Sequence, residues 1–229
     1  MGTRVKKGVT ASTLKWIAVM SMLIDHFGIA IYWQLEQHTY QTYEIFRYIG
    51  RIAFPIYCFL LVEGFFLTKN IWKYIGRCQM FAILSEIPFN MAIYGRIWYP
   101  QRQNVYFTLV IGLCTLVVLD KVRGYDVISI IKQLFVIAIG AGIAQILEVD
   151  YHYLGVLFIV MFYYCREMNK WYRDLVGAAA FSYEVTAPLA MIPIHFYNGE
   201  RGMPLKYEFY LIYPMHLLVY GVIRMLVLS

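Results

Sequence analysis

The chain is a series of long apolar runs separated by short polar stretches. The runs cover residues 14–33, 52–68, 71–94, 105–119, 127–147, 153–165, 175–196 and 209–228. Apolar residues occupy every side of each run, so length is a better guide to the spans than amphipathic period. A helix needs about 20 apolar residues to cross the hydrocarbon. The pattern therefore predicts an all-α, polytopic transmembrane helix bundle of about eight spans. Whether the short runs 105–119 and 153–165 cross fully stays open.

Composition narrows the class of protein. Hydrophobic residues make up 61% of the chain and charged residues 15%, whereas a soluble domain has about 45–50% apolar and ~25% charged residues. Eight spans would take up roughly 160 of the 229 residues. Little is left for a folded region outside the bilayer. We therefore expect one domain over residues 1–229, embedded in the lipid of the cell (inner, cytoplasmic) membrane.

The net charge of +6 is best explained by membrane topology. The basic residues cluster between apolar runs and form no basic helix that would track nucleic-acid phosphates, so we expect no nucleic-acid partner. With a cytoplasmic N-terminus and eight spans, Lys and Arg concentrate on the inner side, in agreement with the positive-inside rule. The inner group is Arg4, Lys6, Lys7, Lys69, Lys73, Arg77, Lys121, Arg123, Lys132, Arg166, Lys170, Arg173 and Arg224, and the outer group is Arg47, Arg51, Arg96, Arg102, Arg201 and Lys206. This division predicts that both termini are cytoplasmic.

Several polar or ionisable residues fall at bilayer depth, where a charged side chain costs about 2.5–3.5 kcal/mol on insertion scales. They are Asp25, His26, Glu63, Glu86, Asn90 and His216. Hydrogen bonds between helices explain any single one of them. So many in so short a chain favour a functional site within the bundle.

Lys15 and His26 are eleven residues apart, which is almost three helical turns, so they share a face about 16 Å apart. Lys15 alone is typical of a lysine that extends to the membrane surface. Imidazole, however, is the usual general base near neutral pH. A cation at the inner mouth and an imidazole deeper in suit a ligand with a phosphate head and a reactive tip, such as acyl-coenzyme A. Asp25 points about 100° away from His26, so we expect it to pair with a cation on another helix.

Two further spans carry polar residues beside a proline. Glu86 and Asn90 lie on one face of the third span, with Pro88 between them. A proline frees a backbone carbonyl, and a kinked helix with freed polar groups commonly lines a cavity. Pro214 has the same effect beside His216. Asn104, at the start of the fourth span, is either a helix N-cap or part of the site.

Six stretches of the chain, in this order, resemble the TraX family of membrane proteins, named for the conjugative factor that acetylates pilin. They are residues 21–28 (SMLIDHFG), 48–56 (YIGRIAFPI), 59–65 (FLLVEGF), 85–90 (SEIPFN), 104–108 (NVYFT) and 213–216 (YPMH). The family usually has an Asp where this chain has Asn90. The Lys15-x10-His26 spacing is also similar to the basic-x10-His motif of membrane acyltransferases that O-acetylate surface sugars. The resemblance implies an acyl-CoA-dependent transmembrane acetyltransferase.

The resemblance and the residues together predict roles. His26 is the expected general base, with His216 as its rival, and direct attack on the thioester is expected because no G-x-S-x-G elbow is present. The expected catalytic set is His26, Asp25 and Glu63; the coenzyme A and oxyanion set is Lys15, Arg51 and Arg77; and the acceptor-binding set is Glu86, Asn90, Asn104, Tyr213 and His216. Acetyl-CoA is the expected co-substrate, and no metal is expected. The acceptor stays open among a peptide N-terminus, a sugar, a lipid headgroup and a small amine.

Two other classes of function are compatible with the same pattern. Carboxylates at mid-bilayer depth and Pro-interrupted helices also occur in small-molecule transporters. A membrane assembly factor without chemistry is the second alternative. Binding of acetyl-CoA separates the transferase from both.

Overall fold

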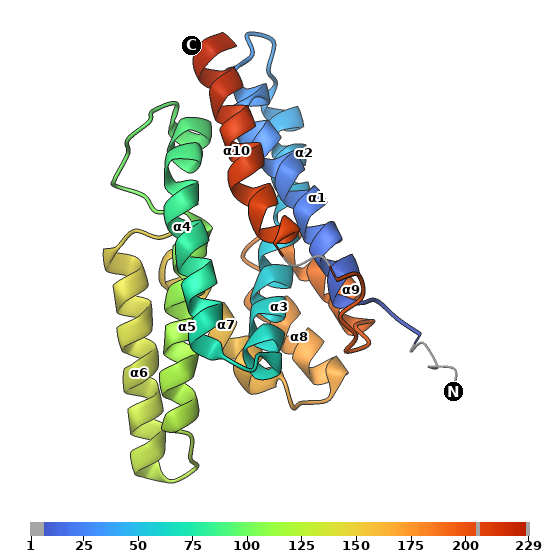
Figure 1. Ribbon diagram of the computed structural model, residues 1–229. Helices are drawn as coiled ribbons and strands as arrows, with labels where there is room; N and C mark the ends of the chain where they lie inside the picture. Colours follow the sequence, from blue (N-terminus) through green and yellow to red (C-terminus); the bar gives the residue numbers. More distant parts are fainter. Residues whose placement is uncertain (1–6, 205–206, 228–229) are drawn as a thin grey trace.

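The computed structural model describes residues 7–204 and 207–227, and these residues fold into helices joined by short loops (Figure 1). The predicted all-α class is confirmed. Arg4, Lys6 and Lys206, which entered the charge comparison, lie outside the described residues. The helices are α1 (Ala11–Ala30), α2 (Tyr40–Gly50), α3 (Ala53–Leu67), α4 (Ile71–Tyr94), α5 (Val105–Lys121), α6 (Val127–Ile146), α7 (His152–Cys165), α8 (Lys170–Ala180), α9 (Met191–His195) and α10 (Glu208–Val227), with short 3-10 turns at Tyr32–Gln34 and Ala187–Ala190.

Polar residues fix where these apolar helices begin. A short side chain at the N-cap accepts a hydrogen bond from a backbone N–H of the first turn, which satisfies a group that has no partner within the helix. Six helices use this device, with the caps Thr10, Thr39, Asn70, Asn104, Asp126 and Asn169. Where the interior is largely apolar, as in α5 and α6, the caps carry the boundary information that hydropathy lacks.

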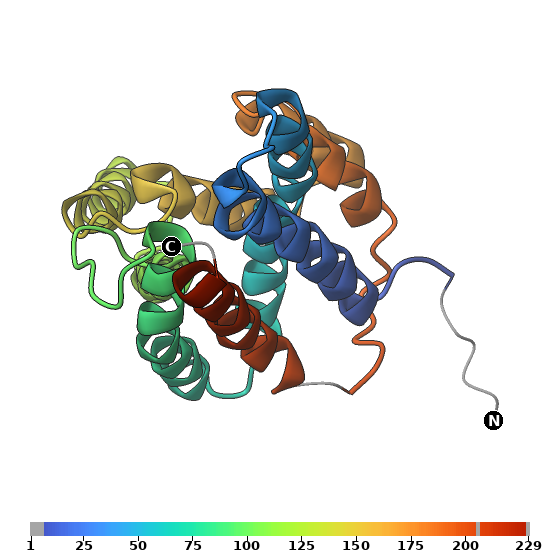
Figure 2. The ribbon, with the colours of Figure 1, turned by 90° about the horizontal axis from the view of Figure 1, so that it is seen from above.

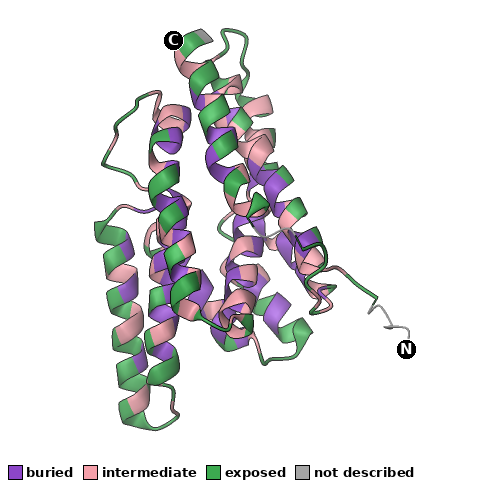
Figure 3. Cartoon of the chain, viewed as in Figure 1, coloured by how far each residue is buried: buried purple, intermediate pink, exposed green. Residues whose placement is uncertain are grey.

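Four helical segments within the described residues are long and apolar enough to cross a bilayer. They are Ala11–Gln34, Tyr40–Leu67, Val127–Ile146 and Glu208–Leu226. The second joins α2 to α3 through a short break at Arg51. α4 is also long, but it carries Lys73, Arg77 and Glu86. Figure 3 shows α6 exposed along most of its length; an apolar helix with its side chains turned outward is typical of contact with lipid. The chain is a membrane protein.

The buried core lies in the middle of the bundle. Most of the fully buried apolar side chains come from α1, α3, α4, α5, α7 and α10, and they form one contiguous cluster that also includes Ala144 of α6 and Ile194 of α9. Figures 1 and 2 show α5, α6 and α7 on one side of this core and α8 and α9 on the other, with α1 and α10 next to each other. The arrangement leaves α1, α3, α4, α5 and α10 around a common space, where the candidate site lies.

α1 and α10 run parallel. The Trp16 and Phe209 rings meet near the start of both helices, with centroids 5.2 Å apart, and Phe27 meets Tyr220 further along. The segment before α10 also lies at the start of α1, because the backbone N–H of Val9 donates to the Phe196 carbonyl. The described chain therefore begins and ends at opposite ends of the bundle (Figure 1). The predictions of about eight spans and of two cytoplasmic termini are therefore not confirmed. Arg201 lies at the end of the bundle where α1 begins, and Arg224 lies at the opposite end.

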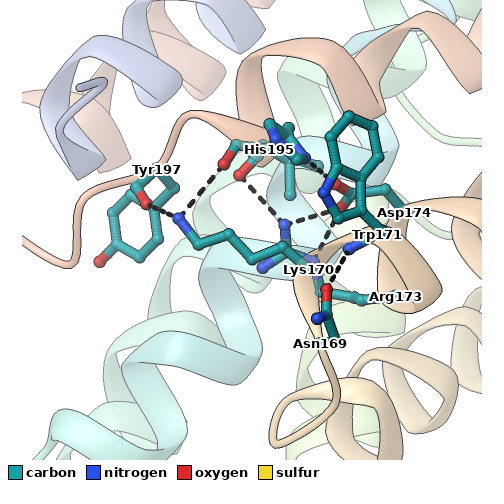
Figure 4. Close-up of polar contacts among 8 residues, drawn as sticks. Asn169, Lys170, Trp171, Arg173, Asp174, His195 and Tyr197 are labelled. Atoms are coloured by element: carbon teal, nitrogen blue, oxygen red, sulfur yellow. Dashed lines mark hydrogen bonds and ion pairs between the residues drawn. The ribbon is translucent and has the colours of Figure 1, made fainter.

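The reason for this difference is the run 175–196, which forms a hairpin instead of a crossing. α8 leads into a turn over residues 181–186, and α9 returns toward the start of α8. At the base of the hairpin, the Nζ of Lys170 donates to the carbonyl oxygens of His195 and Tyr197, at 3.3 and 2.9 Å (Figure 4). The chain thus returns, after α9, to the end of the bundle where α8 begins.

Charged side chains hold the two arms of the hairpin together (Figure 4). Arg173 donates to one carboxylate oxygen of Asp174 through Nε and Nη2, at 2.9 and 2.7 Å, and the other oxygen accepts from Nδ1 of His195 at 2.6 Å. At the tip, Glu184 pairs with Arg51 at 3.1 Å. A short re-entrant segment of this kind is tolerated in a membrane protein because protein groups satisfy its backbone and charges.

Candidate functional site

A cavity of about 620 Å³ lies between α1, α3, α4, α5 and α10. Five basic side chains line it, and they come from the end of the bundle where α1, α4 and α10 begin. They are Lys15, Lys69, Lys73, Arg77 and Arg201. We call this group the basic mouth. Five cations around one opening favour an anionic ligand, because each of them gains Coulomb energy from a bound phosphate.

Secondary structure places each cation of the basic mouth. Lys15 lies in the second turn of α1, with its ammonium 5.2 Å from the centre of the Phe209 ring. Lys69 lies in the tight turn between α3 and α4, and Lys73 donates its backbone N–H to the Asn70 side chain that caps α4. Arg77 follows one turn later. The Asn70 cap fixes the start of α4 and therefore the positions of Lys73 and Arg77 at the basic mouth.

Deeper in, the cavity wall is apolar and aromatic. Its side chains include Tyr57, Leu60, Leu61, Cys78, Tyr106, Leu109, Tyr210 and Tyr213. The tyrosines hold one another in place, since Tyr106 packs edge-on against Tyr213 at 5.1 Å and its hydroxyl donates to the Tyr210 carbonyl. A wall of this composition suits a long, weakly polar arm behind an anionic head.

The inner part of the cavity reaches the neighbourhood of His26. Met22, which lies one turn before His26 on α1, lines the cavity, and so does Tyr213. The Tyr213 ring meets the His26 ring edge-on, with centroids 6.0 Å apart. Lys15 at the mouth and His26 behind the inner wall are therefore arranged along α1 as their spacing predicts.

His26 and His216 lie side by side, although 190 positions separate them in sequence. Nδ1 of His26 is 2.7 Å from Nε2 of His216, and the ring planes differ by only 6°. Sequence reasoning treated these histidines as rivals for the role of base. The structure places them in one hydrogen-bonded pair.

Asp25 points away from His26, as predicted, and pairs with a cation on another helix. Its Oδ2 accepts a hydrogen bond from Nη1 of Arg47, on α2, at 2.7 Å. Arg51, expected at coenzyme A or the oxyanion, instead pairs with Glu184 of the hairpin tip and is absent from the cavity lining given by the described residues. Both residues consequently stabilise helix packing here.

Glu63, expected in the catalytic set, makes a different contact. Its carboxylate accepts from Nε of Arg166, which follows α7, at 2.9 Å. Two residues of α3 close to it, Leu60 and Gly64, line the cavity, but Glu63 itself does not. A helix turns by about 100° per residue, so neighbours in sequence face different partners. This geometry assigns Glu63 to the α3–α7 contact.

A second polar cluster joins α4 to α5, with Asn104 buried and Glu86 half-buried. Asn104 caps α5 through its side-chain oxygen, and its Nδ2 donates both to Oε2 of Glu86, at 2.7 Å, and to the Ala82 carbonyl, at 2.8 Å. Asn104 is thus both a helix cap and part of a polar cluster, which the sequence left as alternatives. Asn90 lies one turn beyond Glu86 and is buried. Within the described residues, Oε1 of Glu86 and Oδ1 of Asn90 find no hydrogen-bond partner.

Comparison with known proteins agrees with these motifs. Residues 10–224 match the family described as TraX protein, which covers nearly the whole chain. The chain belongs to the TraX family.

Two relatives of this TraX-family chain are curated. A probable fimbrial assembly protein, FimC of serogroup H1 from Dichelobacter nodosus, is 29% identical over 238 residues, which cover 91% of this chain and 93% of the relative. An uncharacterized protein of Rickettsia prowazekii (strain Madrid E) is 29% identical over 138 residues, covering 45% of this chain and 52% of the relative. No solved structure matches the chain.

The TraX match includes both histidines and the whole basic mouth. Of the five cations of the basic mouth, the sequence predicts only Lys15 and Arg77 as ligands of coenzyme A. Lys69 and Lys73 carried a signal, since they flank the cap of α4, but charge alone did not separate them from other loop lysines. The sequence predicts Arg201 at the opposite end of the bundle from Lys15, because hydropathy predicts a crossing at 175–196 where the structure has a hairpin.

Proposed function

We propose that the protein is an acyltransferase of the cytoplasmic membrane. It moves an acetyl group from acetyl-CoA, bound at the basic mouth, to an amine or hydroxyl that reaches the bundle interior. His26 serves as the general base. The observation that carries the proposal is the cavity itself, with cations at its opening, an apolar arm-sized wall, and an inner part beside the His26–His216 pair.

The cavity suits the chemistry of an acyl-CoA along its whole length. Coenzyme A carries phosphates at one end, a flexible pantetheine arm and a thioester at the other end. The cations of the basic mouth match the phosphates, and the wall from Leu60 to Tyr213 matches the arm. The thioester would then lie near Met22 and Tyr213, within reach of the histidine pair.

The reaction we propose is a single displacement. The nitrogen or oxygen of the acceptor attacks the thioester carbonyl carbon while His26 takes the proton of that N–H or O–H. The carbon–sulfur bond breaks, and the coenzyme A sulfur leaves as a thiolate that takes the proton back from His26. General base catalysis of this kind is worth about 10²–10⁴-fold. Lys15 and Arg77 bind the co-substrate, and the Tyr213 hydroxyl assists at the carbonyl oxygen.

Membrane orientation follows from the basic mouth. The mouth and the start of α1 lie at the same end of the bundle, and positive charge favours the cytoplasm, where acetyl-CoA is made. We propose that the chain crosses seven times, with α1, α2–α3, α4, α5, α6, α7 and α10 as spans and α8–α9 as a hairpin. The N-terminus is then cytoplasmic and the C-terminus lies outside.

The acceptor is proposed by chemical class only. Oε1 of the half-buried Glu86 and Oδ1 of the buried Asn90 have no hydrogen-bond partner within the described residues and would accept from an incoming amine or hydroxyl, while Asn104 holds Glu86 in place. These residues lie beside the cavity and not in its lining. A peptide N-terminus, a sugar and a lipid headgroup all present such groups. The name of the Dichelobacter relative adds a fimbrial subunit to the acceptors to be tested.

That same name favours one alternative, a fimbrial assembly factor without chemistry. Such a protein needs a surface for its client, but it has no use for a ring of cations around an apolar cavity. Binding of acetyl-CoA therefore decides between the two functions.

The test is titration of the purified protein, in lipid nanodiscs, with acetyl-CoA. We expect saturable binding that weakens as salt rises, because phosphate contacts at a membrane surface are partly screened. Lys15→Ala and Arg77→Ala should each weaken binding about tenfold, the equivalent of about 1.4 kcal/mol. Lys132→Ala removes an exposed cation on α6, outside the cavity, and should change nothing. No binding, or equal effects of all three variants, would contradict the proposal.

A further inference from the structure

The hydrogen bond between His26 and His216 has an in-plane geometry. The ring centroids are 5.0 Å apart and the planes differ by 6°, yet Nδ1 of His26 and Nε2 of His216 are 2.7 Å apart. The rings therefore meet edge to edge instead of face to face. This is the geometry of a strong, directed N–H···N bond, with one proton between the two nitrogens.

A backbone carbonyl decides which nitrogens of His216 carry protons. Nδ1 of His216 is 2.7 Å from the carbonyl oxygen of Ile212, one turn earlier on α10. A carbonyl oxygen only accepts hydrogen bonds, so Nδ1 of His216 carries a proton and donates it. In a neutral imidazole the other nitrogen then has the lone pair. Nε2 of His216 is consequently an acceptor.

The tautomer of His216 in turn determines the tautomer of His26. Because Nε2 of His216 accepts, the proton between the rings belongs to Nδ1 of His26. A neutral His26 then carries its lone pair on Nε2. Two neutral rings are the state expected here, because a buried cation needs a paired anion. Among the described residues no carboxylate accepts a hydrogen bond from either ring, and the nearby Asp25 is engaged by Arg47.

Tyrosine rings hold the pair in this orientation. The Tyr213 ring lies edge-on to the His216 ring, with centroids 5.7 Å apart. The Tyr220 ring also lies edge-on to the His216 ring, with centroids 5.6 Å apart. The hydroxyl of Tyr220 donates to the Leu23 carbonyl of α1 at 3.4 Å. Rotating the His216 ring would break its bonds to Ile212 and to His26 together, so the tautomer is set by the packing of α10 on α1.

We propose that His216 is a positioning residue that fixes His26 as the tautomer with its proton on Nδ1, which makes Nε2 of His26 the atom that takes the acceptor's proton. This inference rests on the proposed transferase function, but the tautomer itself does not depend on any activity.

The pair also accounts for the charge that forms during transfer. When Nε2 of His26 takes the acceptor's proton, the imidazolium still donates its Nδ1–H to Nε2 of His216. His216 in turn donates to the Ile212 carbonyl, so the chain of donors points one way and shares the new charge. The proton on Nε2 then returns to the leaving coenzyme A thiolate, which restores the starting tautomer.

The test begins with nitrogen NMR of the protein labelled with ¹⁵N-histidine in liposomes, without acetyl-CoA. Nitrogen shifts distinguish protonated from unprotonated ring positions, and the His26 signals are assigned by their loss in His26→Gln. We expect a proton on Nδ1 of His26 in the wild type. His216→Gln should keep it there, because the side-chain carbonyl oxygen can accept the same hydrogen bond. His216→Leu offers no acceptor and should shift the proton to a mixture of both positions.

Acetyl transfer by the same variants completes the test. In His216→Leu we expect kcat to fall about 10- to 100-fold, with KM for acetyl-CoA unchanged, because only part of His26 keeps the active tautomer and the imidazolium loses its hydrogen-bond acceptor. His216→Gln should restore most of kcat. Met215→Leu, on the exposed face of α10, is the control and should match the wild type.

Two results would overturn the inference: a wild-type His26 protonated on Nε2, or a His216→Leu protein with the kcat of Met215→Leu. Failure of the proposed function looks different. In that case acetyl-CoA does not bind, while the nitrogen shifts of the wild type and of His216→Leu still differ.

Discussion

The guanidinium of Arg47 lies 2.7 Å from the carboxylate of Asp25, and the backbone of α2 at Gly50 closes over that same carboxylate. Both charged side chains are mostly buried, with 20% and 14% of their surface exposed. The pair joins α1, which carries His26, to α2, which leads through Arg51 into the cavity wall of α3. The Asp25–Arg47 pair makes no hydrogen bond to His26, but it fixes the helix that carries His26. Breaking the pair should therefore change the position of His26.

Gly50 tests how closely α2 approaches Asp25. A Cβ at position 50 would overlap the Asp25 side chain, whereas a Cβ at Gly142, in α6, would meet nothing within 4 Å. Gly50→Ala should lower the free energy of unfolding by about 1–3 kcal/mol, the usual cost of overpacking. Gly142→Ala should leave it equal or raise it slightly, because Ala favours the helix. Thermal unfolding in detergent measures both, and equal midpoints would count against the close approach.

Removal of Arg47 tests whether Asp25 acts as half of an ion pair. Arg47→Met leaves a buried carboxylate without its cation, which typically costs about 3–5 kcal/mol. The double variant Asp25→Asn/Arg47→Met has no unpaired charge, so it should be more stable than the single variant. Urea unfolding in mixed micelles provides the comparison. A double variant that is less stable than Arg47→Met would show that Asp25 has another partner.

The parallel run of α1 and α10 makes a topological prediction. Met203, exposed in the segment that lies against the start of α1, should share the side of the N-terminus, and the C-terminus should lie on the other side. The buried cysteines Cys58, Cys78 and Cys165 and the exposed Cys114 are first replaced by Ala. In intact cells, Met203→Cys should then resist an impermeant maleimide, while a cysteine added after the last residue should react. Labelling of both, or of Met203→Cys alone, would contradict the fold or its orientation.

Sequence alone predicted the parts of this molecule that depend on local periodicity. The rotation of about 100° between adjacent helical residues separated Asp25 from His26, and the Asp25–Arg47 pair confirms it. The spacing from Lys15 to His26 placed both along one side of α1. The cost of polar groups in lipid singled out His26 and His216.

Contacts between distant segments could not be predicted in the same way. Hydropathy does not distinguish an apolar crossing from an apolar hairpin, and the turn at 181–186 is held by Glu184 on Arg51, a partner more than a hundred residues earlier. That one error reversed the direction of α10. It also hid the parallel packing that brings His216 to His26 and Arg201 to the basic mouth.

Acetyl transfer by His26→Ala tests the central claim most directly. Inverted membrane vesicles that contain the wild type or the variant are incubated with [¹⁴C]acetyl-CoA, and label in membrane material is counted, with binding of acetyl-CoA measured in parallel. His195→Ala, in the hairpin outside the cavity, serves as the control. We predict label above background for the wild type and the control, and none for His26→Ala, whose affinity for acetyl-CoA stays within about twofold because a base acts in the transition state. Wild-type incorporation by His26→Ala would contradict the account.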